Sequence, residues 1–414
     1  MTEQKYNRWS ILIATIIVNI CLGTLYAWSI FALPLGNLFG WTAAVTALAF
    51  TICHGLSPVA VISGGYIQDK FGGRASILIG GSMYVVGMFL SGFVTSIGML
   101  YFAYSVLAGI GGGIAYAGTV GNTVKFFPDK RGLAAGLVTA GYGSGAMIVA
   151  PIANALIENY GVLSTFKILG VTFLVIIAIC LLIIKRAPAD YKPDGWEPPI
   201  VAGVTKKAVM EVNWVQMIAD KTWWVVLLIL IFGAMSGLMF ISAVSQIGQT
   251  MFGLTAMTAA LFVSLIAVAN SAGRIFFGAI SDKVGTANTL MIMYIVSALC
   301  LLLCATTQST IGLAISVIGI GAGFGGFMGT FPSIISGRYG LKNFGVNFGV
   351  TFIGFSISAV CGPMLGAMIA MKTGSYQNAL WIILCLNFVG LLFAALFKRL
   401  DRPSHIVTSN SIAK

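Results

Sequence analysis

Runs of about 20 apolar residues recur along the whole chain and constrain its fold more than any other feature. A run of this length crosses a hydrocarbon core about 30 Å thick as a helix. Of the 414 residues, 58% are apolar and only 8% are charged, a composition unlike that of a water-soluble globular domain. We therefore predict an all-α membrane protein with twelve spans, at 9–33, 42–66, 75–95, 99–120, 133–156, 164–184, 223–246, 256–280, 288–306, 309–333, 346–370 and 378–398.

The positions of the charges predict the orientation of the spans. Of 23 Lys and Arg residues, 20 fall in the two termini and in alternate loops, whereas Lys167 and Lys372 lie at the opposite helix ends and Arg274 lies inside a span. The positive-inside rule then places both termini and the long central loop in the cytoplasm. The net charge of +12 is explained by this topology and requires no nucleic-acid partner. We expect a multi-pass protein of the plasma (inner) membrane, its first span retained because it is too long for a signal peptide.

The two halves of the chain repeat each other. We divide it into a six-helix half at 1–184, a cytoplasmic linker at 185–222 and a second six-helix half with a short tail at 223–414. The linker has no domain of its own, and its end near Trp214 is compatible with a helix on the membrane surface. Two helical halves that rock about a central site are typical of secondary transporters. Three echoes support the repeat: "GYIQDKFGGR" (65–74) with "GAISDKVGTA" (278–287), glycines 132/345, 136/349 and 141/354, and "GIGGG" (109–113) with "GIGAG" (319–323).

The first echo predicts contacts that hold one side of the protein closed. Asp69 and Asp282 lie at cytoplasmic helix ends, where each can pair with a neighbouring Lys or Arg or cap an adjacent helix. An ordinary loop with solvated charges is the alternative. The residues that we assign to this gating motif are Gly65, Asp69, Lys70, Arg74, Asp282 and Lys283.

The twelve spans and the stretch "GGYIQDKFGGR" resemble the major facilitator superfamily over the entire chain. This resemblance implies two six-helix halves related by a pseudo-two-fold axis. Three further stretches are more specific, and they resemble the oxalate:formate antiporter family with its lactate- and pyruvate-carrying relatives and, more distantly, the animal monocarboxylate transporters. They are "FFPDKRGLAAGLVTAGYGSG" (126–145), "ANSAGRIFFGAISDKVG" (269–285) and "FPSIISGRYGLKNFGVNFGVTFIGF" (331–355).

Arg274 is a charge without a visible partner. All 11 acidic residues lie in loops, tails or helix ends, and Asp282 is about 12 Å further along the same helix. Burial of a guanidinium costs from about 3 to over 10 kcal/mol. A transported carboxylate, held by two parallel hydrogen bonds, is one partner that would offset this cost. Snorkelling to the surface or bonding to backbone carbonyls is the alternative. The equivalent position in the first half is Val61, and the family resemblance implies that Arg274 binds the substrate carboxylate.

Two further polar residues lie inside predicted spans. Asn270, one helical turn before Arg274, can orient the guanidinium or meet the substrate. Animal monocarboxylate transporters have an aspartate linked to proton coupling at this place, as the resemblance implies. This chain has an amide there, as in the oxalate:formate family, so that proton route cannot be transferred to it. His54 is a candidate for proton uptake, since histidine changes charge near physiological pH. A neutral histidine hydrogen-bonded between helices is the alternative.

Apolar and aromatic side chains on several spans are candidates for the wall of a site near the midplane. Glycine-rich surroundings favour the fourth and tenth spans, although each aromatic ring could instead lie in the core or face lipid. Relative to the oxalate carrier that the chain resembles, Phe355 stands where a second buried cation would be. One cation matches one negative charge, which favours monocarboxylates over oxalate. The candidates are Leu25, Tyr26, Tyr116, Phe324, Phe327, Phe331 and Phe355.

These observations predict a secondary transporter of small monocarboxylates, with lactate and pyruvate as leading substrates. We expect alternating access, with proton symport preferred over anion exchange such as oxalate for formate. No catalytic constellation, nucleotide-binding loop or metal-ligand spacing is visible, so we expect neither an enzyme nor a cofactor. A transporter-like membrane sensor is the alternative from another class. The expected partners are the substrate, protons and the lipid bilayer, and the expected state is a monomer.

Overall fold

The protein is a helical membrane protein with twelve spans. The computed structural model describes residues 7–188, 191–193 and 211–400, and this part of the chain contains no strand. Twelve helical segments within it are long and apolar enough to cross a membrane, as predicted. Several extend beyond the predicted bounds, such as Lys221–Phe252 and Thr310–Tyr339, because the helices continue past the apolar core into polar ends.

The N-terminal half contains the helices up to Ile183. Its first, second and fourth spans are each assembled from shorter pieces. The elements are α1 (Arg8–Leu22), the 3₁₀-helix η1 (Gly23–Ala27), α2 (Trp28–Phe39), α3 (Ala43–Gly55), α4 (Ser57–Phe71), α5 (Gly73–Ser91), α6 (Ile97–Leu100), the π-helix η2 (Tyr101–Ala108), α7 (Gly109–Phe126), α8 (Arg131–Tyr160) and α9 (Val162–Ile183).

The C-terminal half contains longer, mostly continuous helices. Its elements are α10 (Trp214–Ala219), α11 (Lys221–Phe252), α12 (Ala256–Val284), α13 (Thr286–Thr306), α14 (Thr310–Tyr339), α15 (Phe344–Thr351), α16 (Ile353–Thr373) and α17 (Gln377–Leu400).

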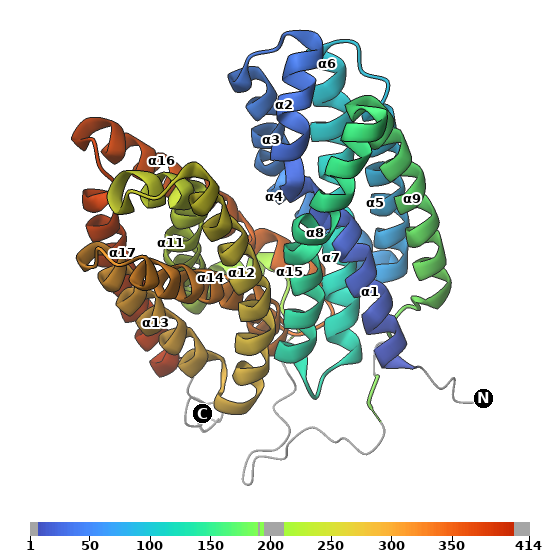
Figure 1. The fold of residues 1–414 in the computed structure, drawn as a ribbon. Coiled ribbons are helices and arrows are strands. Elements are labelled where there is room, and N and C mark those ends of the chain that lie inside the picture. Colours follow the sequence, from blue (N-terminus) through green and yellow to red (C-terminus); the bar gives the residue numbers. More distant parts are fainter. Residues whose placement is uncertain (1–6, 189–190, 194–210, 401–414) are drawn as a thin grey trace, which may run out of the picture.

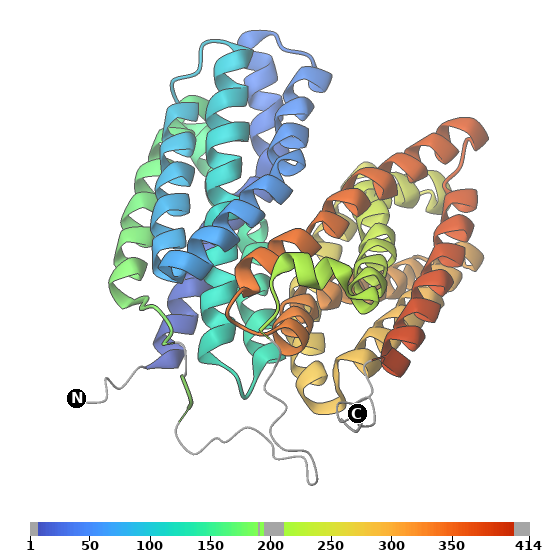
Figure 2. The same cartoon turned by 180° about the vertical axis from the view of Figure 1, so that it is seen from behind.

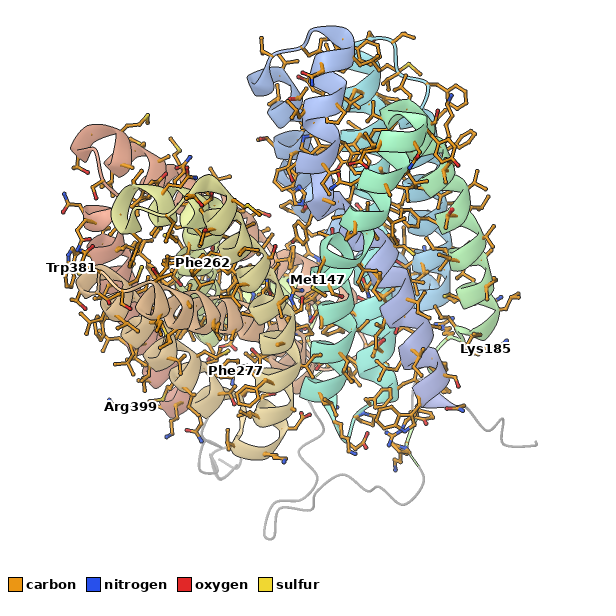
Figure 3. All side chains as sticks on the ribbon, in the orientation of Figure 1. Met147, Lys185, Phe262, Phe277, Trp381 and Arg399 are labelled. Atoms are coloured by element: carbon orange, nitrogen blue, oxygen red, sulfur yellow. The ribbon has the colours of Figure 1, made fainter. Side chains whose placement is uncertain are left out.

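The two halves meet at one end and diverge at the other (Figures 1 and 2). The start of α1 and the end of α17 lie at the end where the halves meet, which we call the termini side. Lys185 and Arg399, labelled in Figure 3, lie on this side, one in each half. At the opposite end α2 and α3 are separated from α16 in both ribbon views.

Glycines make the contact on the termini side possible. Helix α4 packs against α15, and α12 packs against α8. A Cβ atom on Gly65 would collide with the carbonyl oxygen of Gly345, and one on Gly345 would collide with that of Gly65. Gly132 and Gly278 form the same reciprocal pair. Both pairs are related by the 213-residue offset, so the sequence repeat corresponds to two equivalent seams between the halves.

Two carboxylates add reciprocal hydrogen bonds to these seams. Asp282 accepts from the backbone N–H groups of Gly132 and Leu133, both at 2.8 Å. Asp69 accepts from those of Gly345 and Val346, both at 3.0 Å. The N-cap residues of α8 and α15 provide no side-chain cap of their own. Each half therefore caps a helix of the other half, one of the two arrangements that the sequence left open.

The basic residues of the motif do not take part in these hydrogen bonds. Lys70, Arg74 and Lys283 are exposed, and Lys70 contacts Tyr66 of its own helix at 3.4 Å. The cation beside Asp69 is instead Lys125 of α7, at 3.7 Å. In this conformation no hydrogen bond or ion pair joins the three basic residues to the other half within the described residues. They point to water, whereas the carboxylates point to helix ends.

The end of the linker packs on the C-terminal half. Glu211 accepts from the backbone N–H groups of Leu341 and Lys342, and Trp214 is 48% exposed at the start of the short helix α10. Partial burial raises the pKa of Asp220, but hydrogen bonds from the Thr222 backbone and the Tyr339 hydroxyl, with the charge of Arg338, lower this pKa below its ordinary value. Residues 189–190 and 194–210 of the predicted linker lie outside the described residues.

Candidate functional site

A small cavity of about 40 Å³ lies between the halves. It is located where helices are interrupted: η1 in the first span, Leu56 between α3 and α4, η2 before α7, and Phe352 between α15 and α16. Such interruptions allow side chains from several helices to converge on one point. The cavity is lined by Leu25, Tyr26, Cys53, His54, Ser57, Val61, Gly109, Gly113, Tyr116, Tyr142, Arg274, Met328, Phe352 and Phe355.

Arg274 provides the charge of this cavity. Arg274 is 3% exposed, so its side chain does not snorkel to the surface. Its Nε donates to Asn270 Oδ1 at 3.1 Å, and its Nη1 donates to the Thr139 carbonyl of α8 at 2.9 Å. The second bond is of the kind that the alternative expected, a bond to a backbone carbonyl. Within the described residues Arg274 forms no ion pair. A guanidinium has five N–H groups, and only two are used here, so it retains donors for a bound anion.

The backbone of Arg274 is fixed by close packing. Helix α12 lies against α8 on one side and α14 on the other. A Cβ atom on Gly136 of α8, or on Gly329 of α14, would collide with the Arg274 carbonyl oxygen. Small residues at these two positions let both helices approach α12 closely. The guanidinium is therefore held on a rigid, uninterrupted helix.

The pseudo-two-fold axis relates Arg274 to Val61, and both residues line the cavity. The same position thus provides a cation from one half and an apolar wall from the other. Asn270 does not line the cavity but orients the guanidinium through its side-chain oxygen. This corresponds to the first of the two roles that the sequence allowed for Asn270.

Three tyrosines form the polar part of the wall. Tyr26 meets Tyr142 edge to face at 5.1 Å between ring centroids, and Tyr116 meets Tyr142 at the same distance. Their hydroxyl groups form no hydrogen bond with the described residues, so they can serve a bound molecule. Leu25, Tyr26, Tyr116 and Phe355 line the cavity as expected.

His54 also lines the cavity, on the opposite half from Arg274. Its Nδ1 lies 3.1 Å from the carbonyl oxygen of Phe50, one turn earlier in the same helix. The ring packs between Phe50 and Tyr26, at centroid distances of 4.0 and 5.2 Å. His54 is therefore hydrogen-bonded within its own helix. The alternative had supposed a hydrogen bond between helices.

The phenylalanines of α14 correct one expectation. Phe324, Phe327 and Phe331 are buried but do not line the cavity. The ring of Phe324 fills the space beside Gly237 of α11, and Phe327 fills that beside Gly233. Glycines near these rings make room for neighbouring side chains and not for a ligand. Met328, on another face of α14, is the residue that reaches the cavity.

Sequence reasoning missed several cavity residues on the broken second span and the fourth span. Cys53 and Ser57 flank the break at Leu56, and Gly109 and Gly113 begin α7. Pro58, in the first turn of α4, was the signal for the break. No comparable residue marks η1 or η2.

A second, outer groove of about 1010 Å³ lies on the side opposite the termini. Tyr26 belongs to the walls of both the groove and the cavity. Most of the groove's lining residues come from α2, α3 and the turn between them, and they include aromatic, small apolar and small polar side chains. Its lining, which contains no charged residue, comprises Tyr26, Trp28, Ser29, Ala32, Leu33, Gly36, Asn37, Gly40, Trp41, Thr42, Thr46, Phe50 and Thr51.

Two six-helix halves that meet around a buried, charged cavity define a multi-pass membrane transporter. The chain belongs to the Major Facilitator Superfamily, whose profile matches residues 12–357. The fold of the proton:xylose symporter XylE is similar, with a TM-score of 0.74 at 14% identity over 94% of this chain and 95% of that chain.

Three relatives are similar in sequence. The uncharacterized MFS-type transporter YhjX of Escherichia coli is 29% identical over 87% of this chain and 88% of its own length. The oxalate:formate antiporter of Oxalobacter formigenes is 30% identical over 96% of this chain and 93% of its own. Human monocarboxylate transporter 12 is 24% identical over 95% of this chain and 81% of its own.

Proposed function

We infer that the protein is a secondary transporter of small monocarboxylates, with lactate and pyruvate as leading substrates. The observation that carries this proposal is Arg274, a buried guanidinium with unused donors and no carboxylate partner, in a cavity between two halves. A monoanion neutralises one cation, whereas a dianion would leave a carboxylate unpaired at a cost of several kcal/mol. The relative named monocarboxylate transporter supports this substrate class, and so does formate, the monocarboxylate in the name of the antiporter.

The proposed cycle is alternating access. The halves are closed on the termini side by Asp69 and Asp282 and diverge on the other side, where the outer groove lies (Figure 1). Binding of the anion, release of the four carboxylate hydrogen bonds and rocking of the halves would open the termini side. We place the termini side in the cytoplasm and the protein in the plasma membrane as a monomer.

Proton symport is the preferred coupling. Among the described residues, the carboxylates of the spans, Asp69, Glu158 and Asp282, lie near helix ends and none lines the cavity. A proton would therefore enter with the substrate carboxyl or on His54. Anion exchange is the second candidate, favoured by the similarity to the oxalate:formate antiporter over nearly the whole chain.

Proteoliposomes containing the purified protein test both parts. Lactate uptake driven by an inward proton gradient, without internal anion, supports symport, whereas uptake only with a loaded counter-anion supports exchange. Arg274→Gln retains a donor for the Thr139 carbonyl but removes the charge, and we expect uptake to fall about 100-fold or more. Lys372→Gln, an exposed residue, removes one charge elsewhere and is the matched control. Native uptake by Arg274→Gln would refute the assignment of the anion site.

A further inference from the structure

The His54 ring has a defined orientation. Its Nδ1 lies 3.1 Å from the Phe50 carbonyl oxygen, and a carbonyl oxygen only accepts hydrogen bonds. In the neutral ring, Nδ1 must therefore carry the proton, which leaves Nε2 as an acceptor. The rings of Phe50 and Tyr26, on either side, restrict rotation of the imidazole. The Nε2 lone pair is thus held in one direction.

This acceptor has no partner within the described chain. Nε2 is buried and takes part in no hydrogen bond with the described residues. His54 nevertheless lines the same small cavity as Arg274. The guanidinium can only donate, and the tyrosine and serine hydroxyls of the wall can both donate and accept. Among the described side chains that line the cavity, neutral His54 therefore offers, at Nε2, an atom that can accept a hydrogen bond but cannot donate one.

A simple carboxylate cannot satisfy this acceptor. Acetate and propionate have no proton to donate, and the keto oxygen of pyruvate only accepts. A 2-hydroxy acid has a hydroxyl group on the carbon next to its carboxylate. Arg274 and His54 line the same cavity, so a ligand whose carboxylate binds Arg274 can present that hydroxyl to His54. A site that hydrogen-bonds a hydroxyl discriminates against analogues that lack it, because its own polar group is then left unpaired.

We propose that His54 selects short 2-hydroxy monocarboxylates by accepting a hydrogen bond from the substrate hydroxyl at Nε2. This inference rests on the proposed function and narrows its substrate class. It gives the two halves separate tasks. Arg274 of the C-terminal half binds the charge common to all monocarboxylates, and His54 of the N-terminal half recognises the hydroxyl.

Lactate and propionate are the matched ligands for a test, because they differ by one hydroxyl group. Binding of both to the purified full-length protein is measured at pH 8, where histidine is neutral. We expect lactate to bind about tenfold more tightly than propionate, as one net hydrogen bond provides. Pyruvate should rank with propionate. In His54→Phe this ratio should fall to about one through weaker lactate binding, with propionate unchanged.

Lys372→Gln, which changes an exposed residue outside the cavity lining, is the control that should keep the ratio. His54→Gln keeps an acceptor and provides a second variant if the Phe variant does not fold; we expect it to retain part of the preference. Equal affinities for lactate and propionate in the native protein would overturn the inference, as would an unchanged ratio in His54→Phe. Absence of binding by every monocarboxylate would instead overturn the proposed function itself.

Discussion

The two halves share one fold but differ at the cavity. In the N-terminal half the first, second and fourth spans are interrupted, whereas their counterparts α11, α12 and α14 run for 32, 29 and 30 residues without a break. The interrupted helices provide tyrosines and a histidine, and the continuous α12 provides Arg274. The seams on the termini side, in contrast, are alike in both halves. The repeat is therefore visible in the contacts between the halves on the termini side and absent from the residues that line the cavity.

Exchange of the cavity residues across the pseudo-two-fold axis should have the largest effect. In the double variant Val61→Arg and Arg274→Val, the charge remains in the cavity but loses Asn270 as its orienting partner. We expect lactate uptake in proteoliposomes to stay about 100-fold below native, as in Arg274→Gln. Recovery to within a few-fold of native uptake would show that the charge alone suffices and that the continuous helix is not needed.

Substitution of either capping carboxylate should have a smaller effect than the exchange of Val61 and Arg274, and the two substitutions should differ in size. Asp69→Asn and Asp282→Asn each weaken a pair of hydrogen bonds to a helix end, at about 1 to 2 kcal/mol. Asp69→Asn should cost more, because Lys125 at 3.7 Å also loses its counter-charge. Both variants should reduce closure of the termini side, measured by the accessibility of a cysteine introduced at Val346. Equal effects would mean that Lys125 contributes nothing.

Two buried tyrosines, one in each half, provide the test with the smallest expected effect. Tyr84 donates to the Cys21 carbonyl and Tyr294 to the Ile229 carbonyl, both at 2.6 Å. Cys21 lies where α1 gives way to η1, whereas Ile229 lies within the continuous α11. Tyr84→Phe should destabilise the protein by about 1 kcal/mol and Tyr294→Phe by less, since only the first supports an irregular turn. Thermal unfolding in detergent measures both, and a larger effect of Tyr294→Phe would contradict this.

The sequence predicts the fold well because its signals are local or repeated. Apolar runs locate the spans, and the 213-residue offset identified the positions that form the two seams. Arg274 and Asn270 were found because a charge inside an apolar run is unusual and a helical turn separates them. These predictions need no knowledge of which helix faces which.

The aromatic residues of the cavity wall were only partly predictable, because their positions depend on contacts between helices that are far apart in the sequence. Whether Phe327 or Met328 reaches the cavity depends on the rotation of α14, which is set by Gly233 and Gly237 of α11. The π-helix η2 has no proline to announce it, and its side chains bond to other helices, as Ser105 does to the Ala49 carbonyl at 2.7 Å. Such features follow from contacts between distant segments, which one sequence does not display.

The uncharged lining of the outer groove has a kinetic consequence for the proposed anionic substrate. Long-range attraction to the summed charges of a protein accelerates capture of a charged ligand, and charges that line its path contribute most; added salt then slows association. Here the ligand would meet aromatic and small polar groups first and the guanidinium only at the end. The groove lining itself should therefore add little to the attraction of the anion, while the buried Arg274 sets how long the anion stays.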